Sequence, residues 1–541
     1  MSFTLGIVGI GQFGSHFAEL FAAHPDIDAL YAVDSVPERI DAVEARGVAF
    51  AGRFETLEDL LASDVDAVAI FTQRWTHGQH ALAALRAGKH VYSAVPMAIE
   101  EDEIRQITEE VQRTGLVYMM GETSQYNAAV VLARRIHRSG AFGEVFYAEG
   151  DYVHDMDLGF YDAYRYSGGE QWKSTASYPP LLYPTHSIGG ILGVLGERHA
   201  VSVSALGRPD TRGDGVFDKD VSMFGNDVSN AFALFGMDNG GAFRTNELRR
   251  VGYPSHRRES RFRFFGEDSS FEETIDVTYW HDKKDVLEVT DLIRTDRTMS
   301  LDDPRLADVS PTLRDAFVAG ASRAHHQERL PEEFQGMPNG HEGAHHFLVD
   351  DFARAVVGGH QPVVNAWQAA RYTLPGVIAH QSMNRGGERL EIHDLGDCPL
   401  PVVDLDAEQE SLDPQALAAA IEEASAVAAG ASRAHHQERL PAEFQGMPNG
   451  HEGAHHFLVD DFARAVVGGH QPVVNAWQAA RYTLPGVIAH QSMNRGGERL
   501  EIHDLGDCPL PVVDLDAEQE SLDPQALAAA VEEASAVAAG A

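Results

Sequence analysis

A glycine-rich turn near the start of the chain restricts the fold more than any other sequence feature. The apolar run at residues 5–8 leads into G-x-G-x-x-G at 9–14, and an amphipathic stretch continues to residue 23. Glycines at this spacing permit a tight strand-to-helix turn and let backbone N–H groups approach a pyrophosphate at the helix N-terminus. The pattern predicts a dinucleotide-binding unit, with cofactor contacts from Gly9, Gly11, Gln12, Phe13 and Gly14.

An acidic residue follows at the position that such a unit requires. The next apolar run, 29–33, ends in Asp34, twenty residues beyond Gly14. A carboxylate there accepts hydrogen bonds from a ribose diol and repels a 2′-phosphate, which favours NAD over NADP, although Arg39 is close enough to weaken that preference. Apolar runs and helical stretches alternate to about residue 120. We therefore predict a Rossmann domain over residues 1–122, built on a doubly wound parallel sheet.

Charge and composition narrow the class of protein. The 541 residues carry 42 basic and 82 acidic side chains, a formal net charge of −40. A field of that sign repels phosphate backbones and anionic membranes, so we expect no nucleic-acid and no membrane partner. Two cysteines cannot form a disulfide framework, and neither a secretory signal nor a run of 18 apolar residues is visible. We expect a soluble cytoplasmic protein.

The C-terminal half contains a near-identical repeat. Residues 321–430 recur at 431–540, and the two copies differ only where Glu332 becomes Ala442 and Ile421 becomes Val531. Diverged structural arrays share a pattern rather than near-identity, so a recent tandem duplication or an assembly error explains this repeat better. Function is therefore to be sought in residues 1–430, and residues 431–541 are treated as a duplicate.

Each copy predicts the same helical elements. In copy one, helical spacing is seen at 345–356 and 365–383, and an acidic linker with an Ala-rich helix at 414–429 occupies residues 403–430. The acidic run at 404–410 is typical of a solvated face. One core accommodates one set of helices, so we expect copy one to dock on its own chain. Copy two then packs peripherally, pairs with another subunit, or is loosely held.

Further motifs complete a resemblance to the Gfo/Idh/MocA family of NAD(P)-dependent, mostly sugar-active oxidoreductases. Besides the glycine-rich turn, they are Asp34, 72–77, 87–91, Pro96 and 139–145. The resemblance implies an α/β fold in which an α+β domain at 123–402, with an open and mostly antiparallel sheet, faces the cofactor. It also implies NAD as cofactor, a sugar or glycoside substrate, a homo-oligomer, and further cofactor contacts from Asp34, Thr72, His77, Pro96, Glu122 and Tyr126.

Two positions depart from the dehydrogenases of that family. Many of those enzymes carry Glu-Lys-Pro, with the lysine at the catalytic centre, where this chain has Ala94-Val95-Pro96. They also tend to have an aspartate four residues before a catalytic histidine, and here that position is Leu182. Because valine cannot exchange a proton with a substrate hydroxyl, the usual lysine chemistry is missing.

Tyrosine and histidine stand in the corresponding region. Tyr152 and His154 are two apart on a predicted strand and project from one face, while Tyr183 and His186 are three apart at the start of a predicted helix. The positive helix end favours phenolate character in Tyr183. This set resembles the NAD-dependent glycosidase branch of the superfamily (α-N-acetylgalactosaminidase-like), in which two tyrosines and two histidines line the site and Val-Pro replaces Lys-Pro. Burial as ordinary packing residues is the alternative. The catalytic candidates are Tyr183, His186, Tyr152 and His154.

Three functions follow from these observations. The first is an NAD-dependent oxidoreductase that exchanges a hydride with a sugar carbinol carbon. The second is a redox-neutral glycoside hydrolase with resident NAD, which the missing lysine favours. The third is a non-catalytic NAD-bound sensor, in which the lost lysine means lost chemistry.

A zinc-protease signature near the end of copy one has a different interpretation. Residues 341–345 spell H-E-x-x-H, and the same letters recur at 451–455 because the whole segment was copied. In zinc proteases both histidines lie well inside a helix, whereas Pro338-Asn339-Gly340 places His341 at or before the first turn. We predict no metal here and expect His341 and His345 to approach the substrate cleft.

Overall fold

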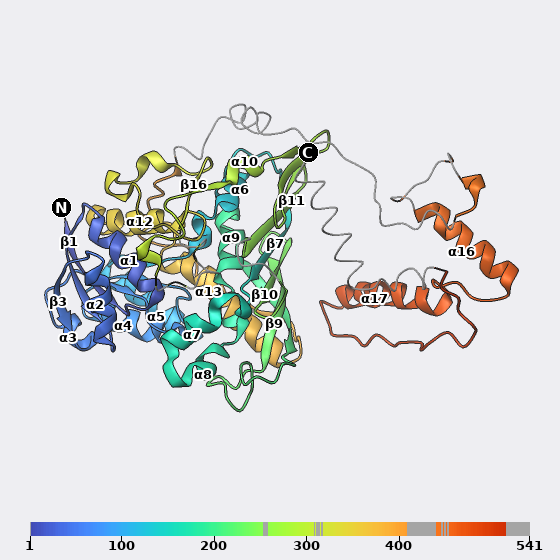
Figure 1. Cartoon of the computed structure of the whole chain (residues 1–541), viewed down its shortest axis with the longest axis horizontal. Coiled ribbons are helices and arrows are strands. Elements are labelled where there is room, and N and C mark those ends of the chain that lie inside the picture. The colour runs from blue at the N-terminus through green and yellow to red at the C-terminus, as the bar shows by residue number, and fades with distance from the viewer. Residues whose placement is uncertain are drawn as a thin grey trace. The chain divides into compact units, whose positions relative to one another are not determined.

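A computed structural model of the chain separates into two compact units, Met1–Ala426 and Val427–Ala541 (Figure 1). Each unit is described by itself. The structure describes residues 2–252, 258–307, 309, 314, 318–407, 440–444, 447, 451 and 454–515.

The first unit begins with a parallel six-stranded sheet in the order β3-β2-β1-β4-β5-β6. Its strands are β1 (Phe3–Val8), β2 (Ile27–Val33), β3 (Phe50–Phe54), β4 (Ala67–Ile70), β5 (His90–Ser93) and β6 (Tyr118–Met120). They alternate with α1 (Gln12–Ala23), α2 (Pro37–Ala45), α3 (Leu57–Leu61), α4 (His77–Arg86) and α5 (Glu101–Thr114). The predicted doubly wound Rossmann sheet is confirmed.

The strand order fixes where a ligand can bind on this sheet. The order reverses at β1, whose neighbours β2 and β4 lead away in opposite directions, and the glycine-rich turn leaves the carboxyl end of β1. Ligands of open α/β sheets bind in the crevice outside the strand ends at such a reversal. The central strands have no exposed face, which is why β4 reads as the uninterrupted apolar run Ala67–Ile70.

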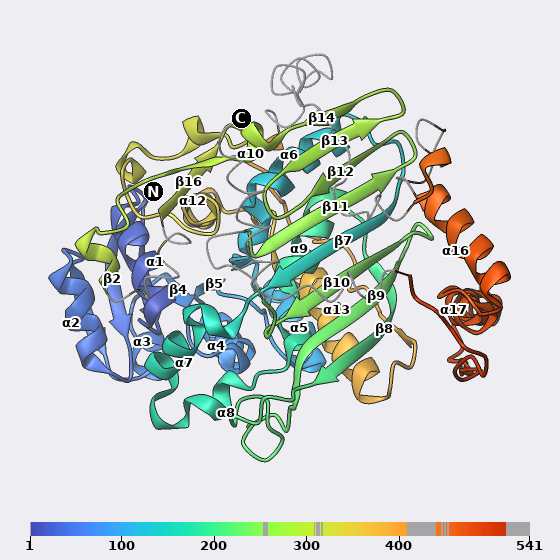
Figure 2. The ribbon, with the colours of Figure 1, turned by 45° about the vertical axis from the view of Figure 1, so that its right-hand side comes forward.

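The second sheet has nine described strands in the order β14-β13-β12-β11-β7-β10-β9-β8-β17, and Figure 2 shows them side by side. Only β7 and β10 pair in parallel, so the predicted open, mostly antiparallel sheet is confirmed. The strands are β7 (Val145–Val153), β8 (Ala200–Pro209), β9 (Val228–Met237), β10 (Ala242–Leu248), β11 (Ser260–Gly266), β12 (Ser269–Glu273), β13 (Thr278–Asp282), β14 (Val286–Glu288) and β17 (Leu390–Glu391).

Helices cover one face of this sheet. In Figure 2, α9 (Thr185–Leu195) and α13 (Ala366–Asn384) lie behind the strands, as does α6 (Ala128–Arg138). Side chains alternate between the two faces of a strand, so on β9 Ala233 and Phe235 are buried while Phe232 and Leu234 are exposed. A further pair of strands, β15 (Thr295–Arg297) and β16 (Ala319–Ser322), and the short helix α10 (Thr290–Ile293) lead into the C-terminal helices.

The duplicated helices have different surroundings in the two units. Copy one supplies α12 (Ala344–Gly358) and α13 to the first unit, where Leu348 and Phe352 are fully buried. Copy two forms the same helices, α16 (Ala454–Gly468) and α17 (Ala476–Asn494), in the second unit, where the equivalent Leu458 and Phe462 are 55% and 66% exposed. The Ala-rich helix predicted at 414–429 lies outside the described residues.

The acidic run at 404–410 was predicted to form a solvated face. The acidic run that begins at Asp404 is not wholly solvated, because Asp406 is buried against Arg329 and Asp404 contacts Arg138. That prediction is therefore wrong for Asp406.

Within the described residues, no helix has both the length and the apolarity that crossing a bilayer requires.

Candidate active site

The three motif glycines occupy positions with different spatial requirements. Gly9 has a φ of +90°, and a Cβ there would lie 2.8 Å from the carbonyl oxygen of Phe71. A Cβ on Gly14 would lie 2.2 Å from the Gly9 oxygen, so this glycine lets α1 pack closely on the turn. Gly11 precedes α1, and a Cβ there would meet nothing within 4 Å. Protein atoms therefore fill the space beside Gly9 and Gly14, whereas the space beside Gly11 is open. A dinucleotide site requires such an open position in the turn.

Asp34 lies directly after β2 and is bonded to the glycine-rich turn. Its Oδ2 accepts from the Ile10 N–H at 2.6 Å, and its Oδ1 accepts from the Val36 N–H at 2.8 Å. Arg39 reaches the same Oδ1 at 3.4 Å and also donates to the Tyr166 carbonyl at 2.9 Å. The carboxylate is therefore held at the edge of the turn, where the predicted ribose contact would be made, with a cation beside it.

Gln12 and Phe13 leave the turn toward different neighbours. Gln12 lines a cleft beside the turn together with Ile10, Arg39, Tyr166 and Arg305. Phe13 instead packs on the ring of Phe71 at 5.9 Å and meets two histidines of the C-terminal region, His341 at 5.7 Å and His345 at 5.5 Å.

Thr72, His77 and Pro96 join the loops that follow β4 and β5. His77 Nδ1 lies 2.9 Å from the Pro96 carbonyl oxygen, and its Nε2 lies 3.1 Å from the Thr72 carbonyl oxygen. The Thr72 hydroxyl bonds to His80 Nδ1 at 3.0 Å. Burial lowers the pKa of His77 to about 4, so this histidine is neutral and holds two cofactor-side loops together.

A chain of three polar side chains connects Glu122 to Tyr183. Glu122 caps the short helix η2 (Thr123–Tyr126), and its Oε1 lies 2.7 Å from His186 Nδ1. His186 is on the first turn of α9, and its Nε2 lies 3.3 Å from the Tyr183 hydroxyl. Burial would raise the pKa of Glu122, but the adjacent His186 outweighs it and holds that pKa below its ordinary value. A carboxylate acceptor at Nδ1 leaves Nε2 free to accept the phenol proton.

Tyr152 and His154 complete the set of four predicted catalytic residues. Tyr152 is on β7, and its ring centroid lies 4.7 Å from that of His186 and 6.1 Å from that of Tyr183. The His154 ring stacks on Tyr152 at 5.1 Å. Burial raises the pKa of Tyr152 well above 10 and lowers that of His154 far below its ordinary value, so both rings are neutral. The structure brings all four side chains together.

His341 and His345 extend this cluster toward the glycine-rich turn. His341 Nδ1 lies 2.8 Å from His345 Nε2, and the His341 ring stacks on His186 at 6.2 Å. Helix α12 begins at Ala344, so His341 and Glu342 precede it, both with positive φ. Burial lowers the pKa of His341 to about 3. These residues were visible in sequence only through a zinc-like motif. Among the described residues no group of three or more His, Cys, Asp or Glu side chains is arranged to hold a metal.

Two arginines beside the tyrosines were not predicted. Arg249 lies 4.9 Å over the Tyr152 ring and pairs with the buried Glu247 at 3.1 Å. Arg74, in η1 (Arg74–Thr76) between Thr72 and His77, lies 4.4 Å over the Tyr183 ring. No sequence signal marked either residue, because the contact depends on strands and loops far apart in the chain.

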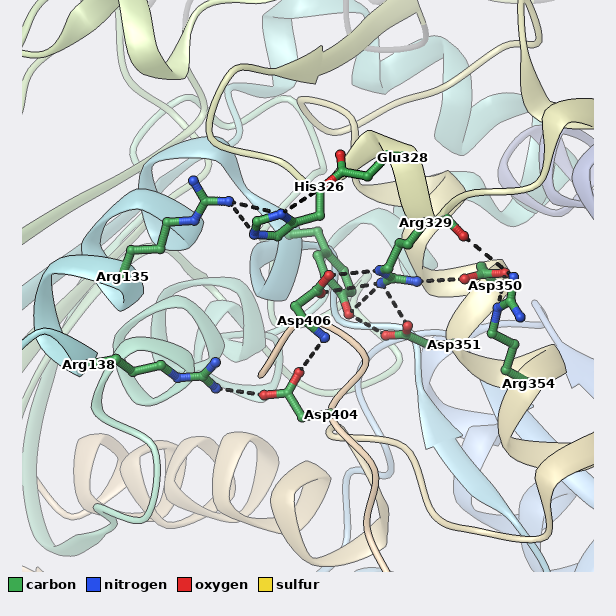
Figure 3. Close-up of polar contacts among 11 residues, drawn as sticks. Arg135, Arg138, His326, Glu328, Arg329, Asp350, Asp351, Arg354, Asp404 and Asp406 are labelled. Carbon is green, nitrogen blue, oxygen red and sulfur yellow. Dashed lines mark hydrogen bonds and ion pairs between the residues drawn. The ribbon is translucent and has the colours of Figure 1, made fainter. Parts of the chain in front are cut away.

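Tyr126, predicted to border the nicotinamide, has its hydroxyl in a different environment. It donates to Asp351 and accepts from Arg329 at 3.1 Å. Figure 3 shows Arg329 between three carboxylates, Asp350 at 2.6 Å, Asp351 at 2.8 Å and Asp406 at 2.8 Å. The Tyr126 ring stacks on Phe347 of α12 at 5.0 Å. In this structure Tyr126 therefore anchors the C-terminal helix through Arg329.

The fold and the glycine-rich turn define an α/β protein with a dinucleotide-binding Rossmann sheet and a second, mixed sheet. Residues 3–122 match the family model of the oxidoreductase family with an NAD-binding Rossmann fold, Gfo/Idh/MocA. The resemblance drawn from the motifs is therefore confirmed over these residues.

Curated relatives align over a longer part of the chain than the family model does. A glycosyl hydrolase family 109 protein of Shewanella pealeana is 28% identical over 223 residues, which cover 38% of this chain and 48% of that protein. A protein of the same name in Streptomyces niveus is 28% identical over 218 residues, covering 38% and 44%. The chain thus spans about half the length of the curated relatives it matches.

Solved structures show the same fold at lower identity. A levoglucosan dehydrogenase in complex with NADH and levoglucosan superimposes with a TM-score of 0.53 and 17% identity, over 72% of this chain and all of that one. The scyllo-inositol dehydrogenase of Lactobacillus casei with bound NAD(H) and scyllo-inositol gives 0.51 and 16%, over 72% and 99%.

Proposed function

We propose that this protein binds NAD at the glycine-rich turn and acts on a sugar, exchanging a hydride with one carbinol carbon. The observation that carries the proposal is the Glu122–His186–Tyr183 chain, which ends in a phenol whose ring lies 4.4 Å from the guanidinium carbon of Arg74 in the Rossmann domain. The relatives support it, since one is named a glycosyl hydrolase, and two proteins of the same fold are dehydrogenases that hold NAD(H) together with levoglucosan or scyllo-inositol.

The residues of this chain would manage the proton of that reaction. Tyr183 accepts the hydroxyl proton of the sugar as its own proton passes to His186 Nε2, and the carboxylate of Glu122 stabilises the resulting imidazolium. Burial raises the pKa of Tyr183, but the positive charge of Arg74 opposes that effect. Passing the proton on to His186 therefore avoids a free phenolate in a buried site.

Bound NAD would supply the hydride acceptor for this step. The residues that would hold it are Gly9 and Gly11 at the pyrophosphate and Asp34 at the adenosine ribose, with the loops joined by His77 against the nicotinamide half. A layer of aromatic rings lies between the glycine-rich turn and His186 and consists of Phe13, His341 and His345. This layer would limit the access of water to the reacting carbon.

A redox-neutral glycosidase is the second candidate, and two observations favour it. Val95 stands where the dehydrogenases have lysine, and the curated relatives are named glycosyl hydrolases. In that reaction the transient oxidation of a ring hydroxyl acidifies the neighbouring C–H. Tyr152 or Tyr183 then removes the proton and the aglycone leaves. Water adds in its place, and return of the hydride and the proton restores the sugar without net redox change.

One assay separates the candidates. Purified protein is mixed with NAD and a panel of sugars and aryl glycosides, and NADH absorbance and aglycone release are followed together. Net NADH supports the oxidoreductase, and aglycone release without net NADH supports the glycosidase. NAD binding without either product supports a sensor, and a protein that does not bind NAD by calorimetry contradicts all three.

The exposed face of the second sheet supports a homo-oligomer. Leu206 on β8 pairs with Phe232 on β9, and the two are 62% and 43% exposed, with Leu234 beside them at 53%. Adjacent exposed apolar side chains on a sheet face mark an association surface. Light scattering that gives a monomer mass at micromolar concentration would contradict this part of the proposal.

A further inference from the structure

Arg74 lies among tyrosines at the candidate active site. Its guanidinium carbon is 4.4 Å from the ring centroid of Tyr183 and 5.4 Å from those of Tyr164 and Tyr178. It also influences the next layer of the cluster, since its charge opposes the burial-driven rise in the pKa of Tyr152 and adds to the burial-driven fall in that of His154. The cation therefore acts on three of the four candidate catalytic residues.

The charge of Arg74 has no acidic partner in the described part of the chain. It contacts three aromatic faces and donates one hydrogen bond, from Nη1 to the Tyr164 hydroxyl at 2.7 Å. The other arginine of the site differs, because Arg249 donates a hydrogen bond to the carboxyl group of Glu247 at 3.1 Å. An unpaired cation in a partly buried site is unfavourable by itself, and in a protein of net charge −40 carboxylates for pairing are abundant.

The hydrogen-bonding capacity of Arg74 is also mostly unused. A guanidinium carries five N–H donors in a planar fork, and only one of them has a protein acceptor here. The remaining donors suit a planar, two-oxygen acceptor that is absent from the protein side of the site. That acceptor would lie beside Tyr183, whose ring centroid is 4.4 Å from the guanidinium carbon.

We propose that Arg74 binds a carboxylate on the substrate, so that the site is selective for acidic sugars of the uronic or aldonic type. The proposal deepens the proposed function, on which it rests, by naming the substrate class of the same site. The carboxylate neutralises the positive charge of Arg74 and orients the sugar so that one of its hydroxyl groups lies at Tyr183.

A carboxylate matches the site better than a phosphate. One guanidinium balances a single negative charge, whereas a phosphate monoester at neutral pH carries nearly two. The surplus charge would face the Glu122 carboxylate and a strongly acidic protein, and the guanidinium of Arg249 is already engaged by Glu247. Tyrosine rings around Arg74 suit the apolar face of a sugar ring rather than a second anion.

The test compares acid and neutral sugars on the full-length protein loaded with NADH. Binding is measured by calorimetry for the pairs D-glucuronate and D-glucose, and D-galacturonate and D-galactose, with D-gluconate and glucose 6-phosphate added. We expect at least one carboxylate sugar to bind about tenfold or more tighter than its neutral partner. Equal or weaker binding of every acid overturns the proposal, and tighter binding of the phosphate overturns the choice of carboxylate.

Two variants assign the preference to Arg74. Arg74→Met should remove it, lowering affinity for the acid by about tenfold or more while affinity for the neutral sugar changes less than about twofold. Arg74→Lys keeps the charge but loses the fork, and should retain part of the preference. The matched control is Arg165→Met, which removes an arginine that stacks on Trp172 at 4.7 Å and pairs with Asp162. An equal loss for acid and neutral sugars in Arg74→Met would mean that Arg74 acts only through the tyrosines.

Failure of the proposed function is seen separately. NADH binding is measured first, and its absence contradicts NAD dependence whatever Arg74 does. Sugar binding is then read without turnover, so an inactive protein that prefers acids still supports the role of Arg74. If Arg74→Met does not fold, the wild-type comparison and Arg74→Lys still decide the matter.

Discussion

His186 Nδ1 lies 2.7 Å from Oε1 of Glu122, and both side chains are almost completely removed from solvent. The contact fixes which ring nitrogen carries the proton and turns Nε2 toward the Tyr183 hydroxyl. It is the arrangement of a carboxylate, an imidazole and a hydroxyl that proton-transfer enzymes use, here with a phenol at the end.

Replacing Glu122 by Gln should therefore cripple turnover without removing the cofactor. The amide cannot stabilise an imidazolium at His186, and we expect kcat to fall by about 10²- to 10⁴-fold while the NAD dissociation constant changes little. Steady-state kinetics and calorimetry provide the measurements. Glu144→Gln, at an exposed glutamate that pairs with Arg198, is the control. A kcat within twofold of wild type would remove Glu122 from the mechanism.

Tyr183→Phe tests the phenol itself. Loss of the hydroxyl removes the group that meets the substrate proton, so both candidate reactions should slow by about 10²-fold or more at unchanged NAD affinity. Tyr147→Phe is the matched control, because its hydroxyl bonds to Glu149 elsewhere on β7. Unaltered turnover in Tyr183→Phe would transfer the role to Tyr152.

Alanine at Gly9 and at Gly11 should separate folding from cofactor binding. Gly9→Ala requires a side chain at φ +90° and a Cβ within 2.8 Å of the Phe71 oxygen, so it should lower the melting temperature markedly. Gly11→Ala places its methyl group in open space, so thermal stability should hold while NAD binding weakens by about tenfold. Equal NAD affinity for Gly11→Ala and wild type, by calorimetry, would show that the cofactor does not approach this turn.

The pH dependence of stability should contain a contribution from Glu247. Burial raises the pKa of this carboxyl from 4.5 to about 8, against the opposing effects of Arg249 and Ser187. The folded state then binds an extra proton between these values, so the contribution is complete below pH 4.5 and is lost as the pH rises toward 8.

Chemical denaturation at pH 5 and pH 8 measures this effect. We expect the unfolding free energy of the wild type to fall by about 1–4 kcal/mol more than that of Glu247→Gln, which cannot ionise. Parallel pH profiles for the two proteins would contradict the shifted pKa.

The second copy of the tail should be dispensable for the stability of the first unit. Copy one already places Leu348 and Phe352 in the core, whereas the equivalent Leu458 and Phe462 are largely exposed. Brief proteolysis of the full chain should cut first within residues 431–541 and leave NAD binding unchanged. Resistance of that segment equal to that of residues 1–407 would show that copy two is packed as firmly as copy one.

The sequence by itself determined the Rossmann domain and the residues of the glycine-rich turn. This was possible because the turn depends on local geometry: Gly9 needs a positive φ, Gly14 needs close packing, and Asp34 follows a strand of fixed length. Spacings of two and three residues likewise placed Tyr152 beside His154 and Tyr183 beside His186, although α9 begins only at Thr185. The apolar helices of copy one were also readable, and contiguity predicted that the core would accept copy one, whose Leu348 and Phe352 are buried.

Only the tertiary structure decided how these pieces meet. Glu122 precedes η2 whereas His186 is on α9, 64 residues further along the chain, and no local pattern encodes the contact between them. Tyr126 turned toward Arg329, and His341 and His345 joined Phe13 across more than 300 residues. Arg74 became part of the site because packing brought three tyrosines from a different domain over its guanidinium. Such contacts are set by the docking of one sheet and its helices on another, and periodicity within a segment carries no information about them.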